Sequence, residues 1–136
     1  HNLYRGCRVL TQKPDYARMR AVINKDAYVT GLVRLADPAL AAEVGCEVGD
    51  PVGCAVFALA VDAGVDPNVI ANGGAGAAAA YVAVDNLYGS EVCNLIWHTN
   101  DAFVDRPTRL RALNLLIDRF EGGIFAPVWP SDPDLC

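Results

Sequence analysis

The segment GDPVGCAVFALAVDAGV, residues 49–65, constrains the fold most strongly because it combines helix signals with very few polar side chains. Asp50 is a suitable N-cap, Pro51 suits the first helical position and Gly64 is a suitable end. Most side chains between Val52 and Ala60 are apolar, so they would cover nearly every side of that helix. A helix without a polar face must be surrounded by other elements, and we therefore expect this helix to be central.

Three shorter helices are expected where an aspartate stands beside a proline, a pairing typical of a helix N-terminus. Asp15 follows Pro14, and the apolar residues after it recur at helical spacing as far as Asn24. Asp37-Pro38 and Asp66-Pro67 each predict the start of a short helical segment. These segments are candidates to cover the central helix.

Two longer helices are expected in the C-terminal half of the chain. The first is rich in alanine, follows the glycine-rich stretch at residues 73–76 and runs to Tyr88. The second begins at Asp105 or Thr108, has one apolar face and ends at Gly122-Gly123.

Four other segments lack a clear helical pattern. Residues 27–35, AYVTGLVRL, predict a short strand or an extended segment, and residues 92–101, VCNLIWHTND, predict a short strand or a helical turn. Residues 1–14 predict an extended lead-in. Residues 122–136 predict a proline-rich arm that lies against the body and covers Trp129.

The whole chain is therefore expected to form a single domain over residues 1–136. Its fold class is mainly α, a compact bundle of four to five short helices with at most a small β element. Hydrophobic residues make up 53% of the sequence and charged residues 20%, which is unlike the composition of a disordered chain. No apolar run is long enough to span a bilayer without meeting a charge, so no membrane span is expected and a soluble domain is predicted.

The charge balance argues against binding to nucleic acid. The formal net charge is -5, whereas sequence-independent binding to phosphates needs clustered Lys and Arg. Four arginines lie in and around the last predicted helix, but acidic residues interrupt them, and we expect them to form a solvated helix face: Arg106, Arg109, Arg111 and Arg119.

Metal and cofactor patterns are weak, and no cofactor is predicted. The cysteines are odd in number and none has CxxC spacing, so they do not predict a zinc site: Cys7, Cys46, Cys54, Cys93 and Cys136. A disulfide between Cys7 and Cys136 and a reducing compartment both stay open, while Cys54 and Cys93 lie in apolar runs and are expected to be buried. A copper site at His1 would need His98 as its second ligand and is not favoured.

Other ligand patterns are incomplete. The glycine-rich stretch 73–76 lacks the Lys-Ser/Thr ending of a phosphate loop, so close helix packing or a flexible loop explains it better. The carboxylate pairs Glu43/Glu47 and Asp132/Asp134 lie in polar stretches, and we expect both to be solvated surface groups.

One constellation suggests catalysis. Cys54 near a helix N-terminus, His98 as its base and Asn100 or Asp101 as the residue that orients the imidazole would make a thiol hydrolase or transferase. The alternative is structural. Cys54 would then pack in the core, and Asn100 and Asp101 would accept hydrogen bonds from backbone N–H groups at the last helix.

The order of several motifs resembles a small uncharacterised family of actinobacteria and their phages. The likeness covers about residues 21–121 and rests on Tyr28-Val29-Thr30-Gly31, then GDPVGCAVFALAVDAG, an alanine-rich helix and LIWHTNDAFVDRPTRLRALNLLID. Two departures are that Phe57-Ala58 replace a glycine-containing pair and that His98-Thr99 stand between Trp97 and Asn100. The resemblance implies a domain organisation and an actinobacterial or phage origin, but no activity.

The sequence thus favours a non-enzymatic accessory or structural protein that binds a protein partner or forms a homo-oligomer, as in a virion or surface assembly. An alanine- and glycine-rich helix and a proline-rich arm are common means of association between small proteins. The thiol enzyme of Cys54 and His98 is the alternative function. A cytoplasmic, virion-associated or secreted location all stay open.

Overall fold

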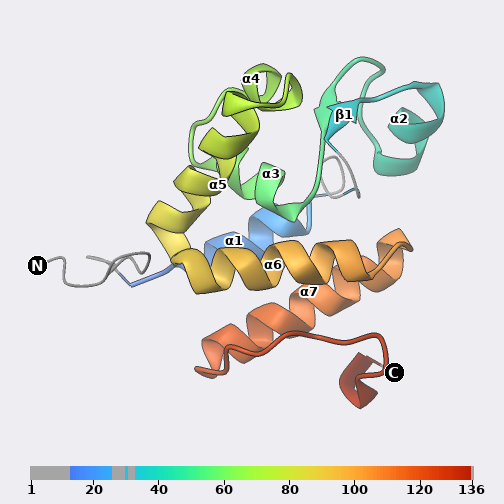
Figure 1. Ribbon diagram of the computed structural model, residues 1–136. Coiled ribbons are helices and arrows are strands. Elements are labelled where there is room, and N and C mark those ends of the chain that lie inside the picture. The colour runs from blue at the N-terminus through green and yellow to red at the C-terminus, as the bar shows by residue number, and fades with distance from the viewer. Residues whose placement is uncertain (1–12, 26–29, 31–32, 136) are drawn as a thin grey trace, which may run out of the picture.

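The computed structural model describes residues 13–25, 30 and 33–135. In these ranges the chain forms seven α-helices, a sheet of two short strands and one 3-10 turn, which confirms the mainly helical class with a small β element (Figure 1). The elements are α1 (Tyr16–Ile23), β1 (Arg34–Leu35), α2 (Pro38–Val44), β2 (Pro51–Val52), α3 (Ala55–Asp62), α4 (Pro67–Ala71), α5 (Ala75–Tyr88), α6 (Ser90–Ala102), α7 (Arg106–Glu121) and η1 (Pro133–Leu135).

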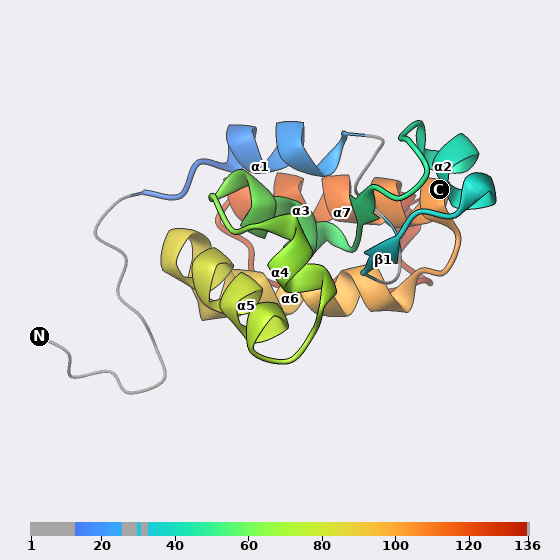
Figure 2. The ribbon, with the colours of Figure 1, turned by 90° about the horizontal axis from the view of Figure 1, so that it is seen from above.

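Helix α3 is the central element, as its sequence predicts. Every residue from Ala55 to Ala60 is at most 2% exposed. The helix contacts α1, α4, α5 and α6, so that its apolar surface meets other helices on several sides (Figure 2). The lack of a polar face therefore determines where α3 lies in the fold.

The predicted start of this helix was wrong by several residues. Pro51 and Val52 form β2, which pairs antiparallel with β1 in the register Arg34 to Val52 and Leu35 to Pro51. Asp50 accepts a hydrogen bond from the Glu47 N–H rather than from a helix. The N-cap of α3 is Cys54, because pairing with a distant strand keeps the preceding residues extended.

The aspartates predicted to begin the other helices were placed correctly. Asp15, Asp37, Asp66 and Asp105 are the N-caps of α1, α2, α4 and α7, and each side chain accepts a hydrogen bond from a backbone N–H in the first turn. Such bonds satisfy donors that have no partner within the helix. These helix starts depend on neighbouring residues only, which explains why the sequence predicts them.

Helix α6 differs from its prediction as a short strand or a turn. It has 13 residues and includes the whole of the segment VCNLIWHTND. Gly89, with φ 92°, separates it from α5. Its buried residues recur at intervals of three and four, which is a helical pattern: Val92, Cys93, Ile96, Thr99 and Asn100.

Helices from the two ends of the chain lie side by side. Helix α1 packs against α7, which in turn packs against α6 (Figures 1 and 2). Arg20 of α1 is the main polar link, since its Nη2 donates to Asp118 at 2.6 Å and to Glu121 at 2.8 Å. The pairs join segments about one hundred residues apart, so they close the bundle, although exposed ion pairs of this kind contribute at most about 1 kcal/mol each.

The C-terminal segment lies against the body as an arm. Asp132 accepts a hydrogen bond from Arg119 of α7 at 2.5 Å, and the same guanidinium donates to the Pro127 carbonyl at 3.1 Å. Val128 is 1% exposed and Phe125 stacks on Phe120 of α7. Trp129, however, stays 61% exposed, so the arm docks as predicted but leaves its tryptophan in solvent.

Two of the four arginines predicted to form a solvated face are instead enclosed. Arg109 is 5% exposed, and its Nε and Nη2 donate to the carbonyl oxygens of Phe103 and Val104. Arg119 holds the arm, as described above. Both guanidinium groups donate to carbonyl oxygens of the irregular segments that precede and follow α7. A helical wheel of α7 does not include those segments, so it cannot predict these hydrogen bonds.

The glycine-rich stretch permits a close helix approach. A Cβ on Gly76 of α5 would lie 2.0 Å from the carbonyl oxygen of Val69 in α4. Gly73 and Gly74 have positive φ values of 76° and 60°, which side-chain-bearing residues rarely adopt. Close packing through small residues is therefore the role of this stretch, in line with the prediction.

Gly76→Ala is expected to lower the free energy of unfolding by about 1–3 kcal/mol, because α4 and α5 must separate to admit the methyl group. Gly122→Ala is the control, since its Cβ would lie 3.6 Å from the nearest atom, an ordinary contact. The control should change stability by about 0.5 kcal/mol or less. Urea denaturation followed by circular dichroism measures both, and equal effects would contradict the close approach.

The arm should also respond to acid. The hydrogen bond from Arg119 lowers the pKa of the Asp132 carboxyl below its ordinary value. A carboxyl with a lowered folded-state pKa stabilises the native state above its unfolded pKa, about 3.9, and this contribution disappears as pH falls through the folded-state value. Asp132→Asn should therefore destabilise the protein at pH 7, and the difference from wild type should vanish towards pH 2.

The measurement is a series of urea denaturations of both proteins across this pH range. Asp134→Asn is the matched control, because Asp134 lies 3.6 Å from Arg119 and its side chain is 68% exposed. A wild-type to Asp132→Asn difference that stays constant from pH 7 to pH 2 would contradict the assignment.

Candidate functional site

The outward face of α6 carries His98 and Asp101 of the predicted thiol site, together with two further exposed residues. Asn94, Trp97, His98 and Asp101 are all exposed and recur at intervals of three and four, so they form one row along the helix. The opposite face of α6 is buried against α3 and α7. These four residues, called here the outer row, therefore lie on the exposed face of α6, and Asn100 lies on its buried face.

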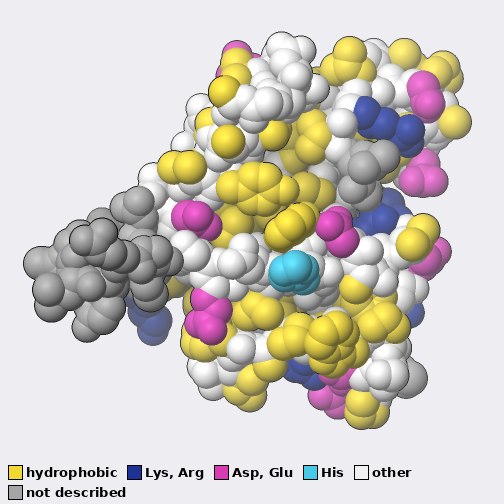
Figure 3. All heavy atoms as spheres, viewed as in Figure 1, with side chains coloured by type: hydrophobic (Ala, Val, Ile, Leu, Met, Phe, Trp, Pro, Cys, Tyr) yellow, Lys and Arg dark blue, Asp and Glu magenta, His cyan; other side chains and the backbone are white. Residues whose placement is uncertain are grey.

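Three rings gather on this face and are called here the aromatic patch: Tyr81 of α5, and Trp97 and His98 of α6. Tyr81 meets Trp97 edge to face, with ring centroids 6.0 Å apart, and His98 lies 4.8 Å from Trp97. Trp97 is 39% exposed and Tyr81 37%. Figure 3 shows a histidine on this face with hydrophobic side chains around it and acidic side chains on both sides.

Cys54 lies at the N-terminus of α3, where a reactive thiol would be expected. It is half-buried against the core and lines a cavity of about 50 Å³ together with Val33, Val56, Phe57, Ile70, Ala77, Ala80 and Tyr81. Burial raises the pKa of the thiol, and this outweighs the opposing effect of the backbone N–H groups of Phe57 and Val56. At neutral pH the Cys54 thiol is therefore protonated, and the cavity is far smaller than typical ligand pockets of about 300–1,000 Å³.

Asn100 has a structural role that differs from both sequence hypotheses. Its Oδ1 accepts a hydrogen bond from the Ala55 N–H at 3.0 Å, and its Nδ2 lies 3.4 Å from the Thr30 carbonyl oxygen. The prediction that Asn100 and Asp101 satisfy the last helix was wrong, because Asn100 serves the start of α3 and Asp105 caps α7. Asp101 is exposed on the outer row.

Among the described residues, no hydrogen bond joins the members of the predicted thiol site. His98 lies against Trp97 at the surface, with the two rings tilted by 31°, and Asn100 is bound to backbone groups. Cys54 packs against the core, as the structural alternative expected. A thiol enzyme stays a prediction.

The other carboxylate pairs lie on the surface or beside an arginine. Glu43 and Glu47 are exposed, as expected, whereas Asp132 and Asp134 lie beside Arg119. Within residues 13–25, 30 and 33–135, no three His, Cys, Asp or Glu side chains are grouped as metal ligands. The hypotheses involving His1, Cys7 and Cys136 lie outside these ranges, and none of the helices described has the length and hydropathy to cross a membrane.

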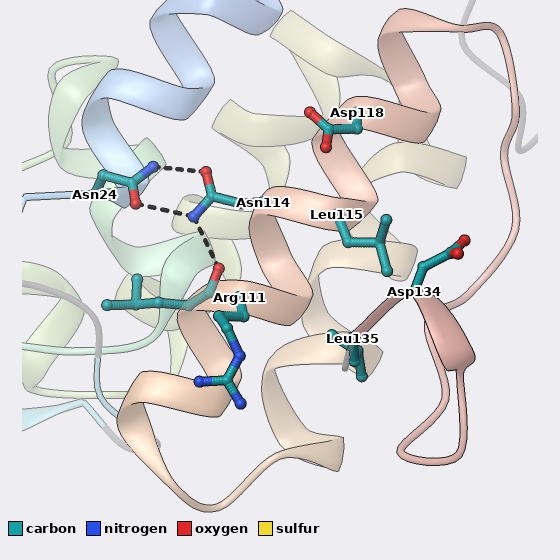
Figure 4. A pocket seen from close by; sticks show the side chains of 8 residues that line it. Asn24, Arg111, Asn114, Leu115, Asp118, Asp134 and Leu135 are labelled. Atoms are coloured by element: carbon teal, nitrogen blue, oxygen red, sulfur yellow. Dashed lines mark hydrogen bonds between the residues drawn. The ribbon is translucent and has the colours of Figure 1, made fainter.

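A second surface feature is a groove of about 480 Å³ between the end of α1, α7 and η1 (Figure 4). Asn24 and Asn114 lie together on one side of it and exchange two hydrogen bonds of 2.9 Å. Leu110, Leu115 and Leu135 contribute apolar surface. The side-chain amides of Asn24 and Asn114 bind each other, and Asp118 binds Arg20. These polar groups are therefore used in the contact between α1 and α7.

Comparisons with models of protein families, with curated proteins and with solved structures found no match. The resemblance to an actinobacterial and phage family therefore stays a prediction. The site must be interpreted from its own chemistry.

The outer row was not predicted, because residues 92–101 were expected to form a short strand or a helical turn. The signal was present: Gly89 marks a break, and the apolar residues that follow recur at helical spacing. A helix with this spacing places Trp97, His98 and Asp101 on one face. Tyr81 could not have been added, since it comes from another helix.

The role of Asn100 can be tested by removing its side chain. Asn100→Ala leaves the buried Ala55 N–H without an acceptor, so the free energy of unfolding should fall by about 2 kcal/mol. Asn94→Ala on the exposed row of the same helix is the control and should change it by about 0.5 kcal/mol or less. Chemical denaturation of both variants decides the question, and a neutral Asn100→Ala would show that this bond is dispensable.

Proposed function

We propose that the chain is a self-associating, non-enzymatic binding domain, an accessory or structural component of an actinobacterium or its phage. The outer face of α5 is the observation that carries the self-association. The proposed origin, and with it a virion or surface assembly, rests on the sequence resemblance alone.

The outer face of α5 is unusual for a surface helix because it is nearly free of charge. Of the 14 residues in the helix, AGAAAAYVAVDNLY, only Asp85 is charged. The exposed residues recur mainly at intervals of three and four: Ala75, Ala78, Ala79, Val82 and Asn86, with Tyr81 and Leu87 beside them. Val82 is 54% exposed and Leu87 46%. The solvent side of a globular helix is normally polar, so this face suits contact with another protein.

A second copy of the chain is the partner that this face suits best. Each chain has a formal net charge of -5, so two copies repel one another through most of their surfaces. An uncharged face avoids that repulsion. Because a twofold interface brings the same patch together from both copies, a face of small apolar residues is also self-complementary. Helix α5 lies at the edge of the bundle, where another helix can approach it (Figures 1 and 2).

Val82→Glu is expected to abolish self-association, since it places two like charges in the interface and leaves the fold unchanged. Val48→Glu is the matched control, because Val48 is 63% exposed in a loop away from α5. Light scattering over a range of concentrations, with native mass spectrometry, should show oligomers for wild type and Val48→Glu and monomers for Val82→Glu. A monodisperse wild-type monomer at all concentrations would refute self-association.

A further inference from the structure

We infer that Trp97 and Asp101 of α6, together with Tyr81 of α5, form a docking site for an arginine side chain of a basic protein partner. The site adjoins the proposed self-association face but does not depend on it. Three features carry the inference: the spacing of the residues, the exposed carboxylate and the charge of the surroundings.

The spacing brings an aromatic ring and a carboxylate together. Trp97 and Asp101 are four residues apart on α6, so their side chains are neighbours on its surface. The Tyr81 ring stands at 71° to that of Trp97, which makes a corner of two rings. Burial is the main cause of the raised pKa of Tyr81, and the charges of Cys54 and then Asp101 contribute less. Trp97 stays 39% exposed although His98 lies against its ring, so the exposed part of the ring and the carboxylate are available to one ligand.

The chemistry of this corner matches a guanidinium group. Arginine stacks its planar cation on aromatic rings and donates paired hydrogen bonds to a carboxylate, whereas the lysine ammonium is a strongly hydrated point charge. Arginine–carboxylate pairs already occur in the chain, since Asp62 accepts two hydrogen bonds from Arg18, and Asp118 and Asp132 each accept one, from Arg20 and Arg119. Asp101 is exposed and has no such pair among the residues described.

The charges around Asp101 leave it available to an incoming cation. The buried Arg109 acts on Asp101 only at a distance, because its guanidinium donates to the carbonyl oxygens of Phe103 and Val104. The acidic chain attracts a basic partner and repels phosphates. A basic protein segment is therefore the partner that this surface favours over nucleic acid.

The test uses the full chain and two synthetic peptides, hexa-arginine and hexa-lysine, with binding followed by calorimetry and by amide and indole NMR shifts. Hexa-arginine should bind saturably, shift the Trp97 indole and the α6 amides, and bind several-fold more tightly than hexa-lysine. Trp97→Ala should weaken its binding about tenfold. Asp101→Asn should weaken it several-fold, because it removes the charge but keeps the shape of the side chain.

Two matched controls make the result specific. Trp129→Ala removes the other exposed tryptophan and Glu47→Gln removes an exposed carboxylate, and both should bind like wild type. Shifts spread evenly over the acidic surface, equal effects of Trp97→Ala and Trp129→Ala, or an absence of saturable binding would overturn the proposal. The monomeric Val82→Glu variant should still bind hexa-arginine, so failure of the docking site and failure of self-association would be separate results.

Discussion

The need to surround α3 is the constraint on which the rest of the structure depends. Its first six residues are fully apolar and buried, and burial of such side chains is the main favourable term in folding. A helix in that position also has N–H groups at its start that solvent cannot reach. Asn100 supplies the acceptor for one of them. Helix α6 therefore contributes both apolar packing and a buried hydrogen bond to α3.

The outer elements are held by a different set of interactions. A row of aromatic rings runs from the arm through α7 and α1 to α5: Phe125, Phe120, Tyr16 and Tyr88, with successive centroids 5.6, 5.6 and 6.4 Å apart. Ion pairs of Arg18, Arg20 and Arg119 lie around it. Rings and charges thus add to the apolar contacts between these segments, and both ends of the described chain pack against α7.

Burial of the core leaves two contrasting outer faces on neighbouring helices. The face of α5 is small, apolar and almost uncharged, whereas that of α6 carries aromatic rings beside a carboxylate. The first suits contact with an identical surface and the second suits contact with a cation. Under the two proposals, one domain occupies a fixed place in an assembly while it holds a second, basic partner.

The sequence by itself determined the features that depend on neighbouring residues. Aspartate caps predicted where α1, α2, α4 and α7 begin, and the apolar run predicted a central α3, because both signals act within one or two helical turns. Of the candidate site, it identified His98 and Asp101 as candidate residues but did not place them with Trp97 on one exposed helix face. Only the tertiary structure decided that Pro51 and Val52 pair with β1, that Asn100 serves a helix 45 residues away, and that Tyr81 joins the ring of Trp97. Each of these depends on contacts between segments far apart in the chain, and local propensity carries no information about which distant groups will meet.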